Sequence, residues 1–386
     1  MILFLHNRYR TTGGEERVVS DLQWLVREHL GEDAELLSRE SAAAGRLTAA
    51  RGLLAGGLDP GEVAAAVRRT RARVVHAHNL HPTLGWRALR AAREAGARVV
   101  LHLHNYRLVC AVGTCFNSRG EDCTRCQGLD TTPGVRLNCR GTGHEAAVYG
   151  AGLALQQRRL TAHADAIVVP SQAAANRLRE LRAPVDPRRL RIVPHVMRSF
   201  AETSRAASGT YALVASRLAP EKGVEMAIDA CVQAGLPLRI AGDGPLVHPL
   251  RRRAQDAAQG AQGTNASITF LGPLSEDALA RQRAGAALAI VASRAAETFG
   301  LAAAEAMAAG LPVAATRVGA LDDLLDPGAL SAPGNVQALA RHAACLYGDE
   351  EQGRRNLGVV RDRCAPSRVA TALSQVYAVD PRPPRL

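Results

Sequence analysis

The stretch ETFGLAAAEAMAAGLPV, residues 297–313, predicts a loop, a helix, a turn and the start of a β-strand in direct succession. Residues 301–309 are mostly small and apolar, as in a buried helix, and the following Gly-Leu-Pro ends that run. Short apolar segments at 287–291 and 313–316 flank the helix and have the composition of buried strands. This order of strand, helix and strand is typical of a parallel sheet covered by helices.

The same alternation extends in both directions and restarts once along the chain. In the second half the pattern predicts strands at 211–216, 238–241, 268–271, 287–291 and 313–316, and helices at 221–234, 245–258, 275–283 and 301–309. In the first half it predicts strands at 2–6, 34–38, 73–77, 98–103, 166–169 and 190–193, and helices at 15–30, 84–95 and 172–181, the last capped by Ser171. We therefore expect an α/β protein whose two Rossmann-like parallel-sheet domains face each other across a cleft.

Composition shifts along the chain predict where these domains begin and end. Small polar residues without periodicity at 197–209 predict a linker between an N-terminal domain, 1–196, and a C-terminal domain, 210–365. The last segment, 366–386, combines a helical pattern, which could pack back on the N-terminal domain, with an extended proline-rich tail. Residues 105–143 interrupt the first domain with a long aperiodic segment, and such segments are usually functional or cross-linked.

Composition also limits the class of protein. Apolar residues make up 47% of the 386-residue chain, which excludes wholesale disorder. The uncharged run from Ala284 to Ala292 is far shorter than the roughly 20 residues that a membrane-spanning helix needs. The opening MILFLH lacks the length and cleavage pattern of a signal peptide, so we expect a cytoplasmic protein.

The net charge of +12 comes with an unusual choice of basic residues. The 48 basic residues are 47 arginines and one lysine, Lys222. The arginines are scattered and aromatic residues are only 3%, which argues against a nucleic-acid-binding surface. Attraction to nucleotides or lipid headgroups stays open, including peripheral membrane contact. A single lysine among so many arginines indicates a position that needs the compact ammonium of lysine and not the planar guanidinium of arginine.

Two glutamates in the opening stretch are candidates for ligand binding. Glu297 follows a predicted strand, and Glu305 lies one turn inside the helix, where a carboxylate could accept hydrogen bonds from ribose hydroxyls. Gly300 and Leu301 open that helix, and backbone amides at a helix start can hold a phosphate. Two surface charges are the simpler alternative, but a carboxylate within an apolar helix needs partners.

Two further loops of the second half follow predicted strands. Arg217 and Lys222 lie in SRLAPEKG, 216–223, at an edge where open α/β sheets bind ligands, and two cations there suit a diphosphate. Solvated loop charge is an alternative that fits Arg217 better than the single lysine. Gly242 and Gly244 in AGDGP, 241–245, are a weaker signal because ordinary turns use the same residues.

The first half offers glycines and histidines at its predicted strand ends. Gly13 and Gly14 follow the first strand and either let amides approach a phosphate or form a tight turn. His104 ends the fourth strand and could contact a sugar hydroxyl or be a polar strand end. A metal site at the end of the third strand is a weak alternative, because no acidic residue is near and alternation should separate the side chains. The histidines concerned are His76, His78 and His81.

Together these motifs resemble the retaining glycosyltransferase family 4, whose members have the GT-B fold. The resemblance covers about residues 1–345: GG after the first strand, HxHNLHP after the third, HNY after the fourth, then SRLAPEKG, AGDGP, FLG and ExFGLxxxEAMAxGxPV. It implies that Arg217 and Lys222 bind the donor diphosphate and that Glu305 binds the ribose. The implied catalytic set is His104, Arg217, Lys222 and Glu297. The implied donor-binding set is Gly13, Gly14, Gly242, Gly244, Leu271, Gly272, Phe299, Gly300, Leu301 and Glu305.

The resemblance also implies a reaction. A sugar would pass from a nucleotide-diphosphate sugar to an acceptor hydroxyl, with retention and without a divalent metal, and no DxD triplet is present. Fixed cations and amides would stabilise the leaving diphosphate, which would take the acceptor proton, so no general base is assigned. The acceptor would be a glycan, a lipid-linked glycan or a small molecule. Family members often carry GG-x-x-E after the last quoted strand, and this chain departs from that pattern at 319–323. Another GT-B enzyme, such as a sugar-nucleotide epimerase, is the nearest alternative.

Five of the eight cysteines fall in the segment 105–143. Cys110, Cys123, Cys126 and Cys139 have the spacing of a structural zinc site, with Cys115 as an alternative ligand. Disulfides are the main rival, free thiols are the simplest alternative, and no cofactor is expected for catalysis. A zinc-knuckle nucleic-acid-binding protein is an alternative of a different class. Because the segment follows His104, we expect it to line the acceptor side of the cleft.

Overall fold

The computed structural model describes residues 1–8, 13–41, 45–260 and 266–378. These residues form two compact units. Unit 1 comprises Met1–Ser118, Cys123–Val196 and the segment that begins at Pro366, and unit 2 comprises Arg119–Asp122 and Met197–Ala365. The tail for which the sequence suggests an extended conformation lies outside the described residues.

Unit 1 is built on a six-stranded parallel sheet in the order β2-β1-β3-β4-β5-β6. Residues 2–7 of the central strand β1 are all buried, as expected for a parallel strand that helices cover on both faces. In register, Ile2 lies opposite Ala34 on one side and Val74 on the other. The strands are β1 (Ile2–Arg8), β2 (Ala34–Glu40), β3 (Val74–Ala77), β4 (Arg98–His102), β5 (Ala166–Val169) and β6 (Leu190–Ile192).

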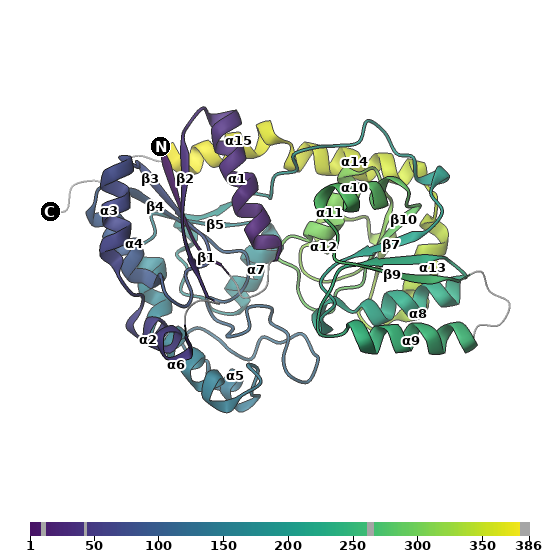
Figure 1. Cartoon of the computed structure of the whole chain (residues 1–386), viewed down its shortest axis with the longest axis horizontal. Coiled ribbons are helices and arrows are strands. Elements are labelled where there is room, and N and C mark those ends of the chain that lie inside the picture. The colour runs from purple at the N-terminus through teal and green to yellow at the C-terminus, as the bar shows by residue number, and fades with distance from the viewer. Residues whose placement is uncertain (9–12, 42–44, 261–265, 379–386) are drawn as a thin grey trace. The chain divides into compact units, whose positions relative to one another are not determined.

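Helices from both ends of the chain cover this sheet. The first helix, α1, packs against the last, α15 (Figure 1). Ser171 caps α7 as predicted, since its Oγ accepts a hydrogen bond from the Ala174 N–H at 3.0 Å. The helices are α1 (Gly14–Leu30), α2 (Arg46–Ala55), α3 (Pro60–Thr70), α4 (Gly85–Glu94), α5 (Thr132–Arg136), α6 (Gly143–Ala162), α7 (Gln172–Glu180), the 3-10 turn η1 (Pro187–Arg189) and α15 (Pro366–Ala378).

Unit 2 repeats the plan with a parallel sheet in the order β12-β11-β10-β7-β8-β9. Its strands are β7 (Ala212–Ala215), β8 (Leu238–Ala241), β9 (Ile268–Gly272), β10 (Leu288–Val291), β11 (Val313–Thr316) and β12 (Leu330–Ser331). Its helices are α8 (Val224–Ala234), α9 (Val247–Gly260), α10 (Glu276–Ala284), α11 (Leu301–Ala308), α12 (Leu321–Leu324), α13 (Val336–Leu346) and α14 (Glu350–Cys364), with 3-10 turns η2 (Ala206–Ser208), η3 (Pro220–Lys222) and η4 (Pro327–Ala329).

Two parallel six-stranded sheets with flanking helices confirm the predicted α/β class of two Rossmann-like domains. The quoted stretch forms the loop after β10, helix α11 and the start of β11, as predicted. The sequence pattern did not predict α2, α3, α5, α6, α12, α13, α14 or the short strand β12. Within the described residues, no helix has both the length and the apolar character that crossing a bilayer requires.

The segment expected to be a linker, 197–209, is packed within unit 2. The Met197 N–H bonds the Cys364 carbonyl at 2.9 Å, and the Ala201 N–H bonds the Ala308 carbonyl at 2.8 Å. Met197, Ser204 and Ala206 are buried. The segment that composition predicted as a linker therefore fits closely against α11 and α14.

Helix α15 belongs to unit 1, although the chain reaches it from unit 2. The Tyr377 hydroxyl lies 2.8 Å from His76 Nδ1, and Arg98 Nε donates to the Val376 carbonyl at 3.0 Å. Val369 and Leu373 are fully buried. The end of the chain thus completes the core of the unit in which it began.

Candidate functional site

The order of strands in unit 2 defines an edge suited to ligand binding. All the strands are parallel, so their carboxyl ends share one edge, and β7 lies between β8 and β10. The chain runs outward from β7 through β8 to β9, and then returns to place β10 on the other side of β7. Open α/β sheets bind ligands at such a reversal of strand order, outside the carboxyl ends of the strands.

Lys222 and Glu297 meet at this point of reversal. Lys222 lies in η3 after β7, Glu297 lies in the loop after β10, and Lys222 Nζ donates to Glu297 Oε1 at 2.6 Å. Ser293 Oγ donates to the same oxygen at 2.5 Å. Burial alone would raise the pKa of Glu297, but the charge of Lys222 and these two hydrogen bonds lower it below its ordinary value. Glu297 is therefore a carboxylate that is ionised at neutral pH.

The pair lines a small pocket. Its walls also include Ser216, Val224 and Ala302, from the end of β7 and the starts of α8 and α11. The cavity volume is about 20 Å³, room for roughly one water molecule. A ligand that needs several hundred Å³ would lie across the mouth of this pocket, against the surrounding loops.

Glycines allow the loops of this edge to approach one another. Gly223 has a left-handed backbone with φ of 57°, and a Cβ there would lie 2.2 Å from the Ala292 carbonyl oxygen. A Cβ on Gly319 would lie 2.3 Å from the Glu297 carbonyl oxygen, which accepts a hydrogen bond from the Ala320 N–H at 2.9 Å. The loop that departs from the family pattern thus packs on the backbone of Glu297.

The remaining predicted residues of unit 2 lie along the same edge. The Gly242 N–H donates to the Gly272 carbonyl at 2.8 Å, so the loops after β8 and β9 adjoin. The Leu218 N–H donates to the Asp243 carbonyl at 2.8 Å, which joins the glycine loop to the loop of Lys222. Gly244, Leu271, Phe299, Gly300 and Leu301 complete the set, with Gly300 at the N-cap of α11.

Two predicted ligand-binding residues have protein partners in this structure. Arg217 pairs with Glu221 of its own loop, and its side chain is 51% exposed. Glu305 pairs with Arg283 of α10, and both side chains are about 10% exposed. Sequence reasoning missed Arg283 and Ser293, because nothing in their local patterns connects them to the two glutamates that they contact.

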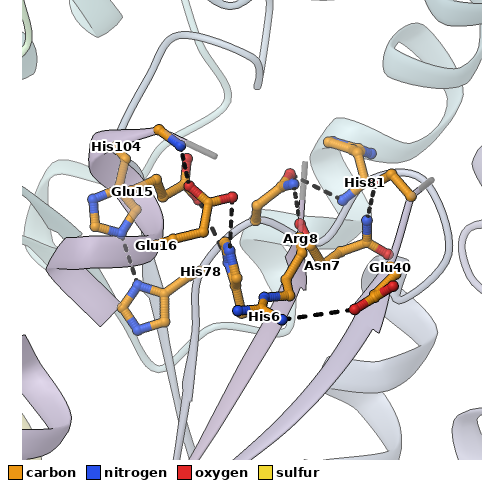
Figure 2. Close-up of polar contacts among 12 residues, drawn as sticks. His6, Asn7, Arg8, Glu15, Glu16, Glu40, His78, His81 and His104 are labelled. Atoms are coloured by element: carbon orange, nitrogen blue, oxygen red, sulfur yellow. Dashed lines mark hydrogen bonds and ion pairs between the residues drawn. The ribbon is translucent and has the colours of Figure 1, made fainter. Parts of the chain in front are cut away.

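Unit 1 also gathers polar side chains where its strand order reverses, between β1 and β3 (Figure 2). The Gly13 N–H donates to Glu16 Oε2 at 2.9 Å. A glutamate of helix α1 thus occupies an amide that was predicted to bind a phosphate. Gly14 is the first residue of α1. Glu15 and Glu16 approach the two ring nitrogens of His6 at 3.8 and 3.7 Å.

His104 is half-buried and belongs to a group of otherwise buried histidines in unit 1. Its Nε2 lies 2.7 Å from His78 Nδ1, and its ring stacks on His102 with centroids 4.1 Å apart. Burial lowers the pKa of His76 and His195 to about 3, and burial with neighbouring imidazoles holds that of His104 well below its ordinary value. These side chains are therefore neutral imidazoles at physiological pH.

The expected separation of His76 and His78 is wrong. Residues i and i+2 of a strand share a face, so alternation would separate only His81 from the other two, and the ring centroids of His76 and His78 lie 4.5 Å apart. Potential ligand atoms lie within 4.8 Å of one another in two groups, His76-His78-His102 and His102-His104-His195. His81 is in neither group.

The five cysteines of the segment 105–143 line one pocket in unit 1. All are free thiols. A hydrogen bond with the Cys115 thiol lowers the pKa of Cys110 to about 6, whereas burial raises that of Cys126 to about 12. This pocket is formed by other residues than the histidine group.

Two family models match the chain, one for each half. A glycosyl transferase 4-like domain matches residues 10–195, and a domain of the glycosyl transferases group 1 matches residues 209–349. The match of the second model includes Arg217, Lys222, Glu297 and Glu305.

Curated relatives match part of the chain. It is 32% identical over 195 residues to an exopolysaccharide phosphotransferase of Streptomyces coelicolor, a region that is 48% of this chain and 20% of that protein. It is 36% identical over 160 residues to a GDP-mannose-dependent α-(1-6)-phosphatidylinositol dimannoside mannosyltransferase of Mycobacterium tuberculosis, 39% of this chain and 37% of that protein. The matches thus span well under two thirds of the length of these relatives.

Solved structures resemble the whole chain. Anabaena HepE in complex with UDP has a TM-score of 0.62 at 17% identity, covering 97% of this chain and 98% of that one. Sucrose-phosphate synthase of Thermosynechococcus elongatus has a TM-score of 0.69 at 17% identity, covering 98% of each chain. At this level of identity, the likeness shows the fold.

Proposed function

We propose that this chain is a glycosyltransferase of the GT-B type that moves a sugar from a nucleotide-diphosphate sugar to an acceptor hydroxyl, with retention and without a divalent metal. The observation that carries the proposal is the meeting of Lys222 and Glu297 where the strand order of unit 2 reverses. The Lys222 ammonium, the Glu297 carboxylate and the start of α11 lie at one edge of the sheet, and this combination suits the binding of a sugar diphosphate.

The donor class has support from named relatives. The Mycobacterium tuberculosis relative uses GDP-mannose by its name, and HepE was crystallised with UDP-glucose. A nucleoside diphosphate lying across the mouth of the pocket would meet Lys222, Gly242 and the start of α11. Leu271 and Gly272 at the end of β9 would border its base.

Lys222 is suited to stabilise the leaving diphosphate. An ammonium has three donors, so it can keep its bond to Glu297 and still donate to a phosphate oxygen. Glu297 holds the ammonium in place before the donor arrives, which is the preorganisation that stabilises developing charge. Arg217 is exposed and would add a second cation by leaving Glu221.

Glu305 and His104 have more local roles in this proposal. A carboxylate has about four acceptor sites, so Glu305 can bind ribose hydroxyls while Arg283 holds it in place. The ring of His104 is oriented by His78 and is neutral because its pKa lies well below its ordinary value. It would hydrogen-bond a sugar hydroxyl as a neutral imidazole. The acceptor proton would pass to the departing phosphate, and the acceptor would be a glycan, a lipid-linked glycan or a small molecule.

The test is calorimetric titration of UDP, GDP and ADP into the wild-type protein and variants of Lys222. Lys222→Ala should weaken the best ligand by about 10- to 100-fold, the loss of one charge-assisted hydrogen bond. Lys222→Arg should recover part of this, because it restores charge without the compact geometry. Arg253→Ala removes a cation that pairs with Asp229 on the helical surface of unit 2, and it should leave affinity unchanged.

If Lys222→Ala binds the nucleoside diphosphate as tightly as the wild type, the diphosphate does not bind at Lys222. Product analysis with the best-binding nucleotide sugar then separates transfer from epimerisation. A transferase needs an acceptor for net turnover and keeps the anomeric configuration of the sugar. A new sugar nucleotide formed without acceptor would identify an epimerase instead.

A further inference from the structure

None of the residues assigned to the donor lines the cysteine pocket of unit 1, and this pocket has the chemistry of a metal site. Cys110, Cys115, Cys123, Cys126 and Cys139 all line it. The rest of its lining is largely apolar, and includes Ala111, Phe116 and Leu137. Five thiols from a stretch of thirty positions, 110–139, thus share one cavity of about 20 Å³.

Four of these cysteines are arranged symmetrically in the sequence. Twelve residues (111–122) separate Cys110 from Cys123, and twelve (127–138) separate Cys126 from Cys139. Two residues separate Cys123 from Cys126, which is the usual spacing of paired ligands in small zinc sites. Two equal loops on either side of a CxxC pair would let four sulfurs reach one ion.

Backbone hydrogen bonds fix the segments that carry the cysteines. The Gly113 N–H donates to the Cys110 carbonyl at 2.9 Å, and the Cys139 N–H donates to the Gly134 carbonyl at 3.1 Å. The Cys126 Sγ lies 3.9 Å from the Thr131 carbonyl oxygen.

Cys115 has a different position from the other four. It is 1% exposed, and its thiol hydrogen-bonds the Cys110 sulfur. Its carbonyl accepts the Cys123 N–H at 2.7 Å. It therefore supports two neighbouring cysteines, and this arrangement leaves the symmetric set of four as the ligands.

We propose that Cys110, Cys123, Cys126 and Cys139 bind one structural zinc ion. Four thiolates in a tetrahedron are typical of zinc, with sulfur atoms about 3.8 Å apart when each bond is about 2.3 Å. Among the described residues, the groups with three ligand atoms within 4.8 Å of one another are histidines, so the cysteine sulfurs are not gathered this closely. Binding of the ion would therefore draw the four sulfurs inward and close the pocket.

The charge of the segment suits this ion. Zinc with four thiolates carries a charge of −2, because four negative sulfurs exceed the +2 of the metal. Residues 105–143 contain five arginines and three acidic residues, a net charge of +2. The arginines are Arg107, Arg119, Arg125, Arg136 and Arg140, and the acidic residues are Glu121, Asp122 and Asp130.

The ion would hold together a part of the chain with little regular structure. Between β4 and α6, the described backbone forms only the short α5 and one isolated bridge, Gln127 with Asp130. Cys110 follows His104 by six positions, and Cys139 precedes α6 by four. A zinc ion would therefore tie the loop that leaves His104 to the base of α6.

The first test is the metal content of the full chain by plasma mass spectrometry. The wild type should carry about one zinc per chain, and the double variant Cys123→Ser/Cys126→Ser should carry close to none. Cys115→Ser and Cys345→Ser should keep the metal, the latter as a matched control because Cys345 is an exposed cysteine of α13. Zinc-free wild type, or full zinc in the double variant, would overturn the proposal.

Cobalt substitution identifies the ligands even if the double variant fails to fold. Wild-type protein loaded with Co²⁺ should show the strong near-ultraviolet band of thiolate-to-cobalt charge transfer. Weak visible bands alone would place the metal on the histidine groups and overturn the proposal. His78→Gln should leave the thiolate band unchanged.

Thiol counting separates zinc from disulfides. Denatured, chelated protein that has not been reduced should show all eight cysteines as reactive thiols. Four or more missing thiols would indicate disulfides and overturn the proposal. A chelator should lower the melting temperature of the wild type, and added zinc should restore it.

Discussion

At the scale of single residues, the paired side chains of this protein decide which groups are charged. Lys222, the one lysine in a chain of arginines, keeps the half-buried carboxylate of Glu297 ionised. Its conspicuous place in the sequence made it predictable. The partners of Glu305 and Arg217 were not predictable in the same way, because Arg283 lies on another helix and Glu221 is one of many acidic residues in the sequence. Composition can thus identify an unusual residue, while its contacts depend on tertiary packing.

The buried histidines make unit 1 sensitive to acid. Burial lowers the pKa of His76 and His195 to about 3, while the unfolded chain has ordinary values near 6.5. Between these values the unfolded state binds more protons, so stability is lost as pH falls below about 6.5. Each such histidine should contribute a loss of about 1.4 kcal/mol per pH unit. Denaturant titrations at pH 7, 6 and 5 would measure it.

The matched variants compare a buried histidine with an exposed one. His195→Gln should make the pH dependence of the free energy of unfolding shallower. His248→Gln, on the exposed side of α9, should leave it as in the wild type. Equal slopes for the wild type and His195→Gln would show that this imidazole is not the titrating group.

At the scale of elements, the strands were easier to predict than the helices. Central parallel strands are continuous apolar runs, and the predicted bounds of β5, β8 and β11 agree with the structure. Helix α6 was missed because glycines interrupt its pattern. Those glycines are packing positions: a Cβ on Gly152 would lie 2.5 Å from the Leu53 side chain of α2. The glycine interrupts the helical pattern because it contacts a residue about a hundred positions earlier in the sequence. The periodicity of a segment carries no information about such a contact.

The loop that carries Lys222 depends on the glycine that follows it. Gly223→Ala would place a Cβ 2.2 Å from the Ala292 carbonyl oxygen in a left-handed conformation, so the loop must shift. Gly235→Ala at the other end of α8 has a similar φ of 66° and nothing within 4 Å. It should cost about 1 kcal/mol from backbone strain alone. Gly223→Ala should cost more and should also weaken nucleoside diphosphate binding, as urea unfolding and calorimetry would measure.

Equal costs for the two variants, with unchanged ligand affinity, would mean that the approach of these loops does not organise the site. A larger cost with unchanged affinity would separate stability from binding and would count against the role given to Lys222.

At the scale of the whole molecule, one plan is used twice. Each unit places its polar side chains at the carboxyl ends of parallel strands, next to the point where the strand order reverses. This explains why motifs dispersed over the sequence could be assigned to common edges from strand order alone. The chain also returns to its first unit through α15, after residues 197–365 have formed the sheet and helices of unit 2.

We infer that the donor diphosphate binds at the edge between β7 and β10. Hydrogen–deuterium exchange of the full chain, with and without the nucleoside diphosphate that binds best, tests where the ligand lies. Exchange should slow in residues 216–223 and 292–301, with little change in α9 and α13. Slower exchange confined to other segments, with these two loops unaffected at saturating ligand, would contradict it.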